Sequence, residues 1–331
     1  SLESIGSRAF YNLNQITGSL IVNNIKSIGN RAFEGCSNLN ANLDLGNQLG
    51  FIGFNAFNGC NFKSLRIGNN YSFPPTFISP ETFAGSNFTG LTIDGEAEEI
   101  GRSDFSFFES YSNNCRLTLE EGIEEIVDNC FEGFNFIGNL NLPESMTYLG
   151  YNAFYDCNFT GLTFSEPSSL SIMEAGVFAN NNLINGEVIF PSQLNEIGQN
   201  CFSGCVGIDG IVLSDTLSFI NSGAFQGCSS ITGLSLTRNL NGIEEKAFHN
   251  CSSINADLPV PDSVVYVGSG AFEGCTSIND VYVNSEALQT GSLLNGPTGS
   301  LYVTTSFLPY YGATFDGLTV NTWNNYPEPT P

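Results

Sequence analysis

The sequence predicts one solenoid of short stacked coils that is rich in β-strand. This prediction is based on an internal repeat. A segment of the form Ile-Gly-x-x-Ala-Phe-x-Gly-Cys recurs, as in residues 28–36 and 52–60. Its phenylalanine occurs twelve times at intervals of 22 to 26 residues, with a mean of 23.8. A repeat this short cannot bury its own apolar face, so the copies must stack on one another. The 331 residues therefore measure about 12 to 13 coils rather than a number of domains. The repeated residues are Phe10, Phe33, Phe57, Phe83, Phe105, Phe131, Phe154, Phe178, Phe202, Phe225, Phe248 and Phe272.

One element of each repeat has the periodicity of a strand. Apolar residues alternate with other residues in triplets such as residues 43–45, 91–93 and 162–164. Period-two alternation is typical of a strand with one buried face, and parallel copies pair about 4.8 Å apart. The middle residues of the triplets should then form a solvent-facing row along the rod. These residues are Ile21, Asp44, Arg66, Thr92, Thr118, Asn141, Thr163, Ile189, Val212, Ser235, Asp257, Tyr282, Tyr302 and Thr319.

The segment around each repeated phenylalanine is predicted to be a short helical or 3-10 turn. It follows a second apolar pair, such as Leu49 and Ile52. Two positions beyond the phenylalanine, eleven of the twelve copies carry Gly, Asn or Asp. These residues tolerate the left-handed conformation that ends a helical turn. Phe107 is the exception and marks an irregular coil.

The Ile-Gly-x-x-Ala-Phe-x-Gly-Cys segment, with an apolar strand between copies, resembles the BspA-type leucine-rich repeats. The resemblance covers residues 1 to about 320 and implies one leucine-rich-repeat solenoid of short parallel strands over residues 1–320. Residues 299–303, followed by Tyr310, Tyr311 and Trp323, are similar to a closing coil, so residues 279–320 are expected to be C-terminal capping coils. The resemblance also implies a bacterial or protist surface protein, with adhesion or host-protein binding in some members. It implies no shared catalytic motif.

The two ends of the sequence lead to further expectations. Residues 321–331 are rich in proline and are expected to be a tail or the start of an extended linker. Residues 1–10 enter in mid-repeat without a polar cap, so we expect the natural chain to extend further in that direction. Both features fit an ectodomain at an extracellular or cell-surface location.

The charge balance excludes several classes of partner. Acidic residues outnumber basic ones 33 to 9, which leaves a formal charge of −24. A protein of this charge repels the phosphates of nucleic acids and of anionic membranes. The sequence also contains no stretch close to the roughly 20 apolar residues that a membrane-spanning helix needs. We therefore expect no nucleic-acid partner and no membrane insertion.

The cysteines and the histidine, residue types that often act in catalysis, mostly occupy regular positions of the repeat. Seven of the ten cysteines stand three positions after the phenylalanine, and no Cys-x-x-Cys pair occurs. This placement predicts buried, reduced thiols that pack as small apolar side chains. His249 is the only histidine and is expected to face solvent, because that repeat position also holds Tyr11, Glu34 and Asn58. With no second histidine there is no nucleophile-base pair or zinc site to assemble, so we predict a non-enzymatic protein without a cofactor.

Two acidic pairs occupy equivalent repeat positions. Glu98 and Glu99 precede Ile100, and Glu124 and Glu125 precede Ile126. Stacking places these like charges about one coil apart, which is unfavourable unless water or a cation screens them. Hard carboxylate oxygens are the ligands that calcium prefers. A calcium site and a solvated acidic face both fit the sequence.

Departures from the repeat indicate where a ligand would bind, because the fold does not require them. Two irregular segments, residues 71–75 and 107–114, add aromatic side chains to neighbouring coils. Insertions in solenoids commonly form loops on the binding face, although such rings can also pack onto the rod. The candidate ligand-binding residues, in coils three to six, are Tyr71, Phe73, Phe107, Phe108 and Tyr111 with Thr92 and Thr118 of the triplet row.

These observations predict a monomeric, cell-surface interaction protein. Its ligand would be a host protein or a glycan, bound through the exposed strand row and the loops of coils three to six. The alternative is a structural spacer that holds another domain away from the cell, which the uniform repeat and the proline-rich tail also fit.

Overall fold

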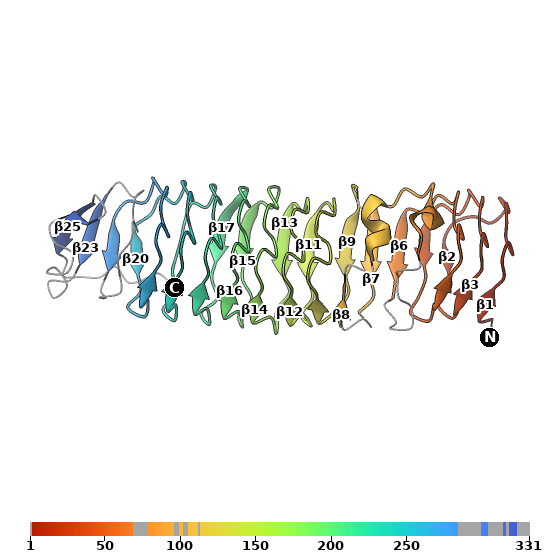
Figure 1. The fold of residues 1–331 in the computed structure, drawn as a ribbon, viewed down its shortest axis with the longest axis horizontal. Helices are drawn as coiled ribbons and strands as arrows, with labels where there is room; N and C mark the ends of the chain where they lie inside the picture. The colour runs from red at the N-terminus through yellow and green to blue at the C-terminus, as the bar shows by residue number, and fades with distance from the viewer. Residues whose placement is uncertain are drawn as a thin grey trace.

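The computed structural model describes residues 2–68, 78–95, 99–101, 105–111, 113–283, 299–303, 314–315 and 318–322. The chain winds into a long rod of stacked coils, with strands as its main regular elements (Figure 1). Within the described ranges, no helix is long and apolar enough to cross a membrane. The parallel solenoid predicted from the repeat is confirmed.

Strands from the apolar triplets follow one another along the rod in four separate sheets, and we call them together the triplet column. Neighbouring strands in it run parallel, for example β6 with β7 and β7 with β9. The final strand, β25, also pairs antiparallel with β24. The strands are β2 (Leu20–Ile21), β4 (Asn42–Asp44), β6 (Ser64–Ile67), β7 (Gly90–Ile93), β9 (Arg116–Leu119), β11 (Asn139–Leu142), β13 (Gly161–Phe164), β15 (Gly186–Ile189), β17 (Ile208–Val212), β20 (Leu258–Val260), β22 (Val281–Val283), β23 (Ser300–Val303), β24 (Thr314–Phe315) and β25 (Leu318–Thr322).

A second column of two-residue strands runs beside the first, and we call it the pair column. The sequence analysis did not predict these strands, because two residues are too few to show an alternating pattern. Eight of them form one parallel sheet from β8 to β21, and β1, β3 and β5 form another. The strands are β1 (Ser4–Ile5), β3 (Ser27–Ile28), β5 (Phe51–Ile52), β8 (Glu99–Ile100), β10 (Glu125–Ile126), β12 (Tyr148–Leu149), β14 (Ile172–Met173), β16 (Glu196–Ile197), β18 (Phe219–Ile220), β19 (Gly242–Ile243) and β21 (Tyr266–Val267).

The segment around each phenylalanine is a hydrogen-bonded turn, and 3-10 helices occur in two coils of the described chain. These are η2 (Pro80–Phe83) and η3 (Ser106–Tyr111). In the other coils the backbone alternates its partners. The amide of Ala32 donates to Gly29 three residues back, whereas the amide of Phe33 donates to Ala56 in the next coil. The expected helical turn is therefore replaced in most coils by a turn that bonds across the stack.

The left-handed positions after the phenylalanine are confirmed. All eleven Gly, Asn and Asp residues two positions beyond it have positive φ, from 54° at Asp156 to 94° at Gly85. A second left-handed position, two residues before the phenylalanine, was not predicted. It is held by Asn55, Asn129, Asn152 and Asn200, and also by Lys246 with a φ of 57°. In the coils that have both positions, they flank the phenylalanine and turn the chain so that its alternate amides face the next coil.

Phenylalanine rings form the centre of the core and stack from coil to coil. The rings of Phe154 and Phe178 lie 5.6 Å apart and nearly parallel, and those of Phe248 and Phe272 lie 5.3 Å apart. Such contacts add packing energy beyond the burial of apolar area. The repeated phenylalanines from Phe33 to Phe272 are buried.

All ten cysteines are buried and free, as predicted. Those at the repeat position follow one rule: each thiol donates to the carbonyl of the phenylalanine in the preceding coil. Cys228 Sγ lies 3.1 Å from the Phe202 oxygen, and Cys275 Sγ lies 3.1 Å from the Phe248 oxygen. Asn181 takes the cysteine position in its own coil and donates to Phe154 in the same way, at 2.7 Å. Burial raises the pKa of the Cys60 and Cys205 thiols to about 12, so these sulfurs are thiols and not thiolates.

Two members of the predicted triplet row were assigned wrongly. The register pairs Pro259, not Asp257, with Tyr282, and it pairs Asn321, not Thr319, with Tyr302. In both coils the register partner lies two positions later than the sequence pattern indicates, although Asp257 and Thr319 are themselves exposed.

His249 also differs from expectation, because it is half-buried. Its Nε2 lies 3.8 Å from the Glu273 carboxylate of the next coil. The coil that follows covers part of the ring, an effect that a single repeat unit does not reveal.

Candidate functional site

The row of middle residues on the triplet column is the best-defined exposed feature of coils two to five. Register pairs Asp44 with Arg66, Arg66 with Thr92, and Thr92 with Thr118 across β4, β6, β7 and β9. Their neighbours Leu91 and Ile93 are fully buried, so the residue between them must point outward. We call this surface the triplet face.

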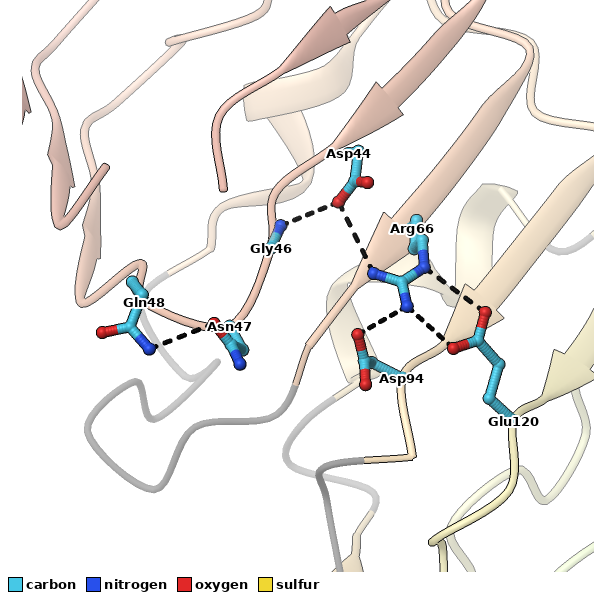
Figure 2. Close-up of polar contacts among 7 residues, drawn as sticks. All are labelled: Asp44, Gly46, Asn47, Gln48, Arg66, Asp94 and Glu120. Carbon is cyan, nitrogen blue, oxygen red and sulfur yellow. Dashed lines mark hydrogen bonds and ion pairs between the residues drawn. The ribbon is translucent and has the colours of Figure 1, made fainter. Parts of the chain in front are cut away.

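Arg66 is the centre of an ion cluster on this face (Figure 2). Its Nη2 lies 2.6 Å from Asp94 Oδ2 and 2.7 Å from Glu120 Oε2. Its Nε donates to Glu120 Oε1 at 3.3 Å, which makes the contact with Glu120 bidentate. Asp44 Oδ1 lies 3.8 Å from Nη1 and also accepts the amide of Gly46 at 2.9 Å. One guanidinium thus links residues from four successive coils.

The electrostatics of the cluster hold the arginine in one position. Three carboxylates surround a single cation, which leaves the group with a formal charge of −2. The hydrogen bond that Arg66 donates to Glu120, followed by the charges of Asp94, Glu120 and Asp44, raises the pKa of Arg66. The Arg66 side chain is 34% exposed, so part of it remains open to solvent. The arrangement suits recognition of a polar surface.

The two predicted threonines lie on the triplet face beside this cluster. Thr118 is exposed and Thr92 is half-buried. Their hydroxyls extend the row away from Arg66 on β7 and β9, where strands lie about 4.8 Å apart. The structure therefore brings Thr92 and Thr118 together.

The predicted aromatic residues of coil five lie inside the rod. Phe107 and Phe108 are 3% and 0% exposed, and Tyr111 packs half-buried against the core. They belong to η3, which displaces the glycine turn of this coil and directs the rings inward. The ring of Phe107 lies tilted against that of Phe83, with centroids 5.8 Å apart, while the ring of Phe105 contacts that of Phe131 at 5.5 Å. The alternative in which these rings pack onto the rod is correct, and the proposal that they contact a ligand is withdrawn. Tyr71 and Phe73 lie outside the described residues.

The predicted acidic stack is present in part. Glu99 and Glu125 are register partners on β8 and β10, and Glu124 is exposed next to them. Glu98 lies outside the described residues. Within the described part of the chain, no three His, Cys, Asp or Glu side chains converge closely enough to hold a metal ion. The like-charge pairing is real, but the described carboxylates form no preassembled metal site.

The Arg66 cluster was missed by the sequence analysis. Asp44 and Arg66 were placed side by side in the predicted row, which was a usable signal for their contact. Asp94 and Glu120 each follow their triplet by one residue and therefore fall outside the alternating pattern. Their contacts with Arg66 form just beyond the ends of β7 and β9, where the triplet pattern makes no prediction.

The fold and the exposed row define this chain as a leucine-rich-repeat solenoid. The family model described as "BspA type Leucine rich repeat region (6 copies)" matches residues 3–107, 104–232 and 195–294. The chain belongs to this BspA-type family. No curated protein matches it in sequence.

Several solved structures are similar to the chain. A leucine-rich repeat protein from Bacteroides ovatus is 19% identical, with 97% of this chain and 88% of that chain covered and a TM-score of 0.41. A leucine rich cell surface protein from Faecalibacterium prausnitzii is 20% identical, with 87% and 84% covered and a TM-score of 0.40. The pneumococcal vaccine antigen PcpA is 15% identical, with 98% and 85% covered and a TM-score of 0.37.

Proposed function

We propose that the protein is a non-enzymatic interaction module at a cell surface, which binds a protein partner through the triplet face between β4 and β9. The observation that carries this proposal is the in-register row Asp44, Arg66, Thr92 and Thr118. The buried side of the repeat does not require these side chains. Membership of the BspA-type family supports the surface location, since repeats of this type resemble those of bacterial surface proteins.

The physical properties of the row favour recognition. It stands on a parallel sheet whose inward side chains, such as Leu65 and Leu91, are fully buried. A rigid backbone and a guanidinium already held by carboxylates lose little conformational freedom when a partner binds. The threonine hydroxyls can both donate and accept hydrogen bonds. Arg66, Thr92 and Thr118 can therefore form several directed contacts at a small entropic cost.

The test compares arrays probed with the chain and with two variants. Thr118→Arg places a bulky cation in the row, whereas Gln199→Arg places the same side chain at an exposed position after β16, in the other column. We expect the wild-type chain to capture partners on an array of host cell-surface proteins. Thr118→Arg should lose them and Gln199→Arg should keep them. Loss in both variants, or in neither, would contradict this location of the site.

A glycan array, run in parallel, separates the two classes of ligand. Binding to glycans but not to proteins would show that the ligand of this row is a glycan rather than a protein. Blank arrays of both kinds would favour the spacer. The spacer is supported by the pair column, in which eight strands from β8 to β21 form one parallel sheet along the rod (Figure 1), a regularity that requires no ligand.

Calcium is a second proposal, based on the register pair Glu99 and Glu125. A bridging cation would relieve the repulsion between these carboxylates. Under this proposal calcium raises the melting temperature, chelation lowers it, and Glu125→Gln abolishes the response. A melting temperature that is the same with calcium and with a chelator would contradict the calcium proposal.

A further inference from the structure

The solvent-facing side of the pair column carries a second ordered row, separate from the triplet face. Register pairs Glu125 with Tyr148, Tyr148 with Ile172, and Ile172 with Glu196 on β10, β12, β14 and β16. These strands follow one another along one edge of the rod (Figure 1). Each of the four residues precedes a buried one, such as Leu149 or Met173, and therefore faces outward.

Apolar side chains in this row are exposed without a structural need. Ile172 is 40% exposed, and Tyr151, three residues after Tyr148, is 48% exposed. The same row position is held by Ser4 and Ser27 in the first coils, so the fold accepts a small polar residue there. Tyr148 and Ile172 on the sheet, with Tyr151 in the turn after β12, form an apolar strip that water hydrates poorly.

Carboxylates border this strip on both sides. Glu125 and Glu196 end the row, and Glu174 lies beside the tyrosines, where its charge and a hydrogen bond raise the pKa of Tyr151. Residues 117–237 contain 14 Asp and Glu and no Lys, Arg or His. No basic side chain of this segment can therefore neutralise the surface.

From this combination we infer that the surface of Glu125, Tyr148, Tyr151, Ile172, Glu174 and Glu196, which we call the acidic-aromatic row, docks an extended polypeptide segment that carries lysine or arginine. The apolar strip would accept an aliphatic side chain or the methylene stem of a basic residue, while the carboxylates bind the charged ends. A second copy of this chain is disfavoured as the occupant, because its own formal charge is −24.

The spacing of the row defines the segment further. Glu125 and Glu196 stand on strands three steps apart, which is about 14 Å at 4.8 Å per step. Along an extended chain, residues i and i+4 lie about 13 Å apart on the same side. A segment with basic residues at i and i+4 and an apolar residue at i+2 therefore matches the row. The negative electrostatic field of this surface would also raise the association rate of such a basic segment at low salt.

The experiment measures binding of a fluorescent peptide, Lys-Ser-Leu-Ser-Lys-Ser-Leu-Ser-Lys, to the whole chain at low ionic strength. Two control peptides carry Glu in place of Lys, or Ser in place of Leu. We expect the first control not to bind and the second to bind several-fold more weakly. Binding of the Lys-Leu peptide should weaken steeply with added salt, because exposed charges are screened over about 10 Å at 0.1 M.

Two triple variants with the same change in net charge locate the site. Glu125→Gln, Glu174→Gln and Glu196→Gln neutralise the acidic-aromatic row. Glu187→Gln, Asp209→Asn and Asp215→Asn neutralise exposed residues in or beside the triplet column. We expect about a tenfold weaker Kd for the first triple variant and less than a threefold change for the second, since each exposed ion pair contributes little.

Equal losses in the two triple variants would mean that the peptide follows the overall charge, and would overturn the inference. So would a failure of the wild-type chain to bind the peptide. Tyr151→Ser should weaken binding several-fold without changing the charge, and an unchanged Kd would also count against the site. A benzophenone amino acid in place of the first leucine of the peptide tests the wild-type chain directly, and crosslinks should map to residues 147–151 and 171–174. These results are independent of the arrays that test the triplet face.

Discussion

Arg66 and Glu120 are 54 positions apart in sequence, yet the guanidinium makes a bidentate contact with the carboxylate. The pair spans β6, β7 and β9, and it brings Asp44 and Asp94 into the same cluster. An arginine held in this way has two roles: it reduces the repulsion among three acids, and its partly exposed side chain is fixed in one position on the surface.

Arg66→Gln should destabilise the protein by about 1 kcal/mol, because Asp44, Asp94 and Glu120 would then repel one another around a partly exposed site. The loss appears as a lower urea midpoint and shrinks in 1 M salt. Lys26→Gln removes an exposed pair with a single partner, Glu3, and should change the midpoint little. Equal effects of the two substitutions on the urea midpoint would show that the cluster stabilises the protein no more than an ordinary surface ion pair does.

Asn181→Cys should stabilise the protein by about 1 kcal/mol. Asn181 is fully buried, and its Oδ1 has no hydrogen-bond partner among the described residues. A cysteine there could still donate to the Phe154 carbonyl, as Cys157 donates to Phe131, without burying an unpaired oxygen. Thermal melts check the gain, and the reverse change, Cys205→Asn, should lower the melting temperature. An Asn181→Cys variant that melts earlier would contradict the account.

Lys246→Asn should also stabilise the protein, by roughly 0.5 to 1 kcal/mol. Lys246 has a φ of 57°, in the left-handed region that a lysine adopts at a cost. Asparagine occupies the same repeat position at Asn152 and Asn200, where φ is 52° and 54°. The salt bridge between Lys246 and Glu245 is exposed and contributes little to stability. The measurement is the denaturant midpoint, with Asn200→Lys as the opposite substitution, expected to lower it.

The ten cysteines should not react with a chromogenic aryl disulfide in the native protein at pH 8. Burial blocks access and raises the pKa of Cys60, Cys115 and Cys205 to about 12, so almost no thiolate forms at that pH. In concentrated guanidinium all ten should react. Ser171→Cys, at an exposed position, provides a reactive control. Rapid labelling of the native wild-type chain would show that the coils open.

Glu166 should make stability depend on acid pH. Its carboxylate accepts the amide of Ser192 at 2.7 Å and that of Ser168 at 3.0 Å, which lowers its pKa. A folded-state pKa below the unfolded value means that the unfolded chain binds the extra proton, so the stabilisation is present above the ordinary glutamate pKa and is lost as the pH falls through the lowered one. Because Glu166 is exposed, the loss should stay below about 1 kcal/mol.

The measurement for Glu166 is a series of thermal melts between pH 7 and pH 3. Glu166→Gln should melt below the wild type at pH 7 and converge with it at the acid end. Glu187→Gln, at an exposed position on β15, should follow the wild type throughout. A constant gap between Glu166→Gln and the wild type would contradict the assigned cause.

Local rules that recur in every coil were predictable from the sequence. The phenylalanine column, the buried cysteines and the left-handed turn after each phenylalanine follow from residues that repeat, so one coil predicts the rest. The two-residue strands of the pair column, such as β12, were missed because pairing with the next coil, and not a pattern within the coil, makes them strands.

Features that depend on contacts between coils were harder to predict. The sequence predicts Phe107 and Phe108 in a binding loop. In the structure they belong to η3, and their rings pack inward against Phe83 and Phe88. The Arg66 cluster needed the relative positions of strand ends that lie up to 54 residues apart. Only the part of it that lay in one register row, Asp44 beside Arg66, could be seen in the sequence.

The backbone bonds of the turn segments give the stack a direction. At one junction the amides of Arg31, Phe33 and Gly35 donate to the next coil, and at another those of Asn129, Phe131 and Gly133 do the same. Junctions built in this way are equivalent to one another, whereas η2 and η3 replace the turn in two coils. Duplication or loss of a whole coil between equivalent junctions preserves these backbone bonds at the seam, so the length of the rod can change in steps of a single coil while the side chains on its outer faces diversify independently.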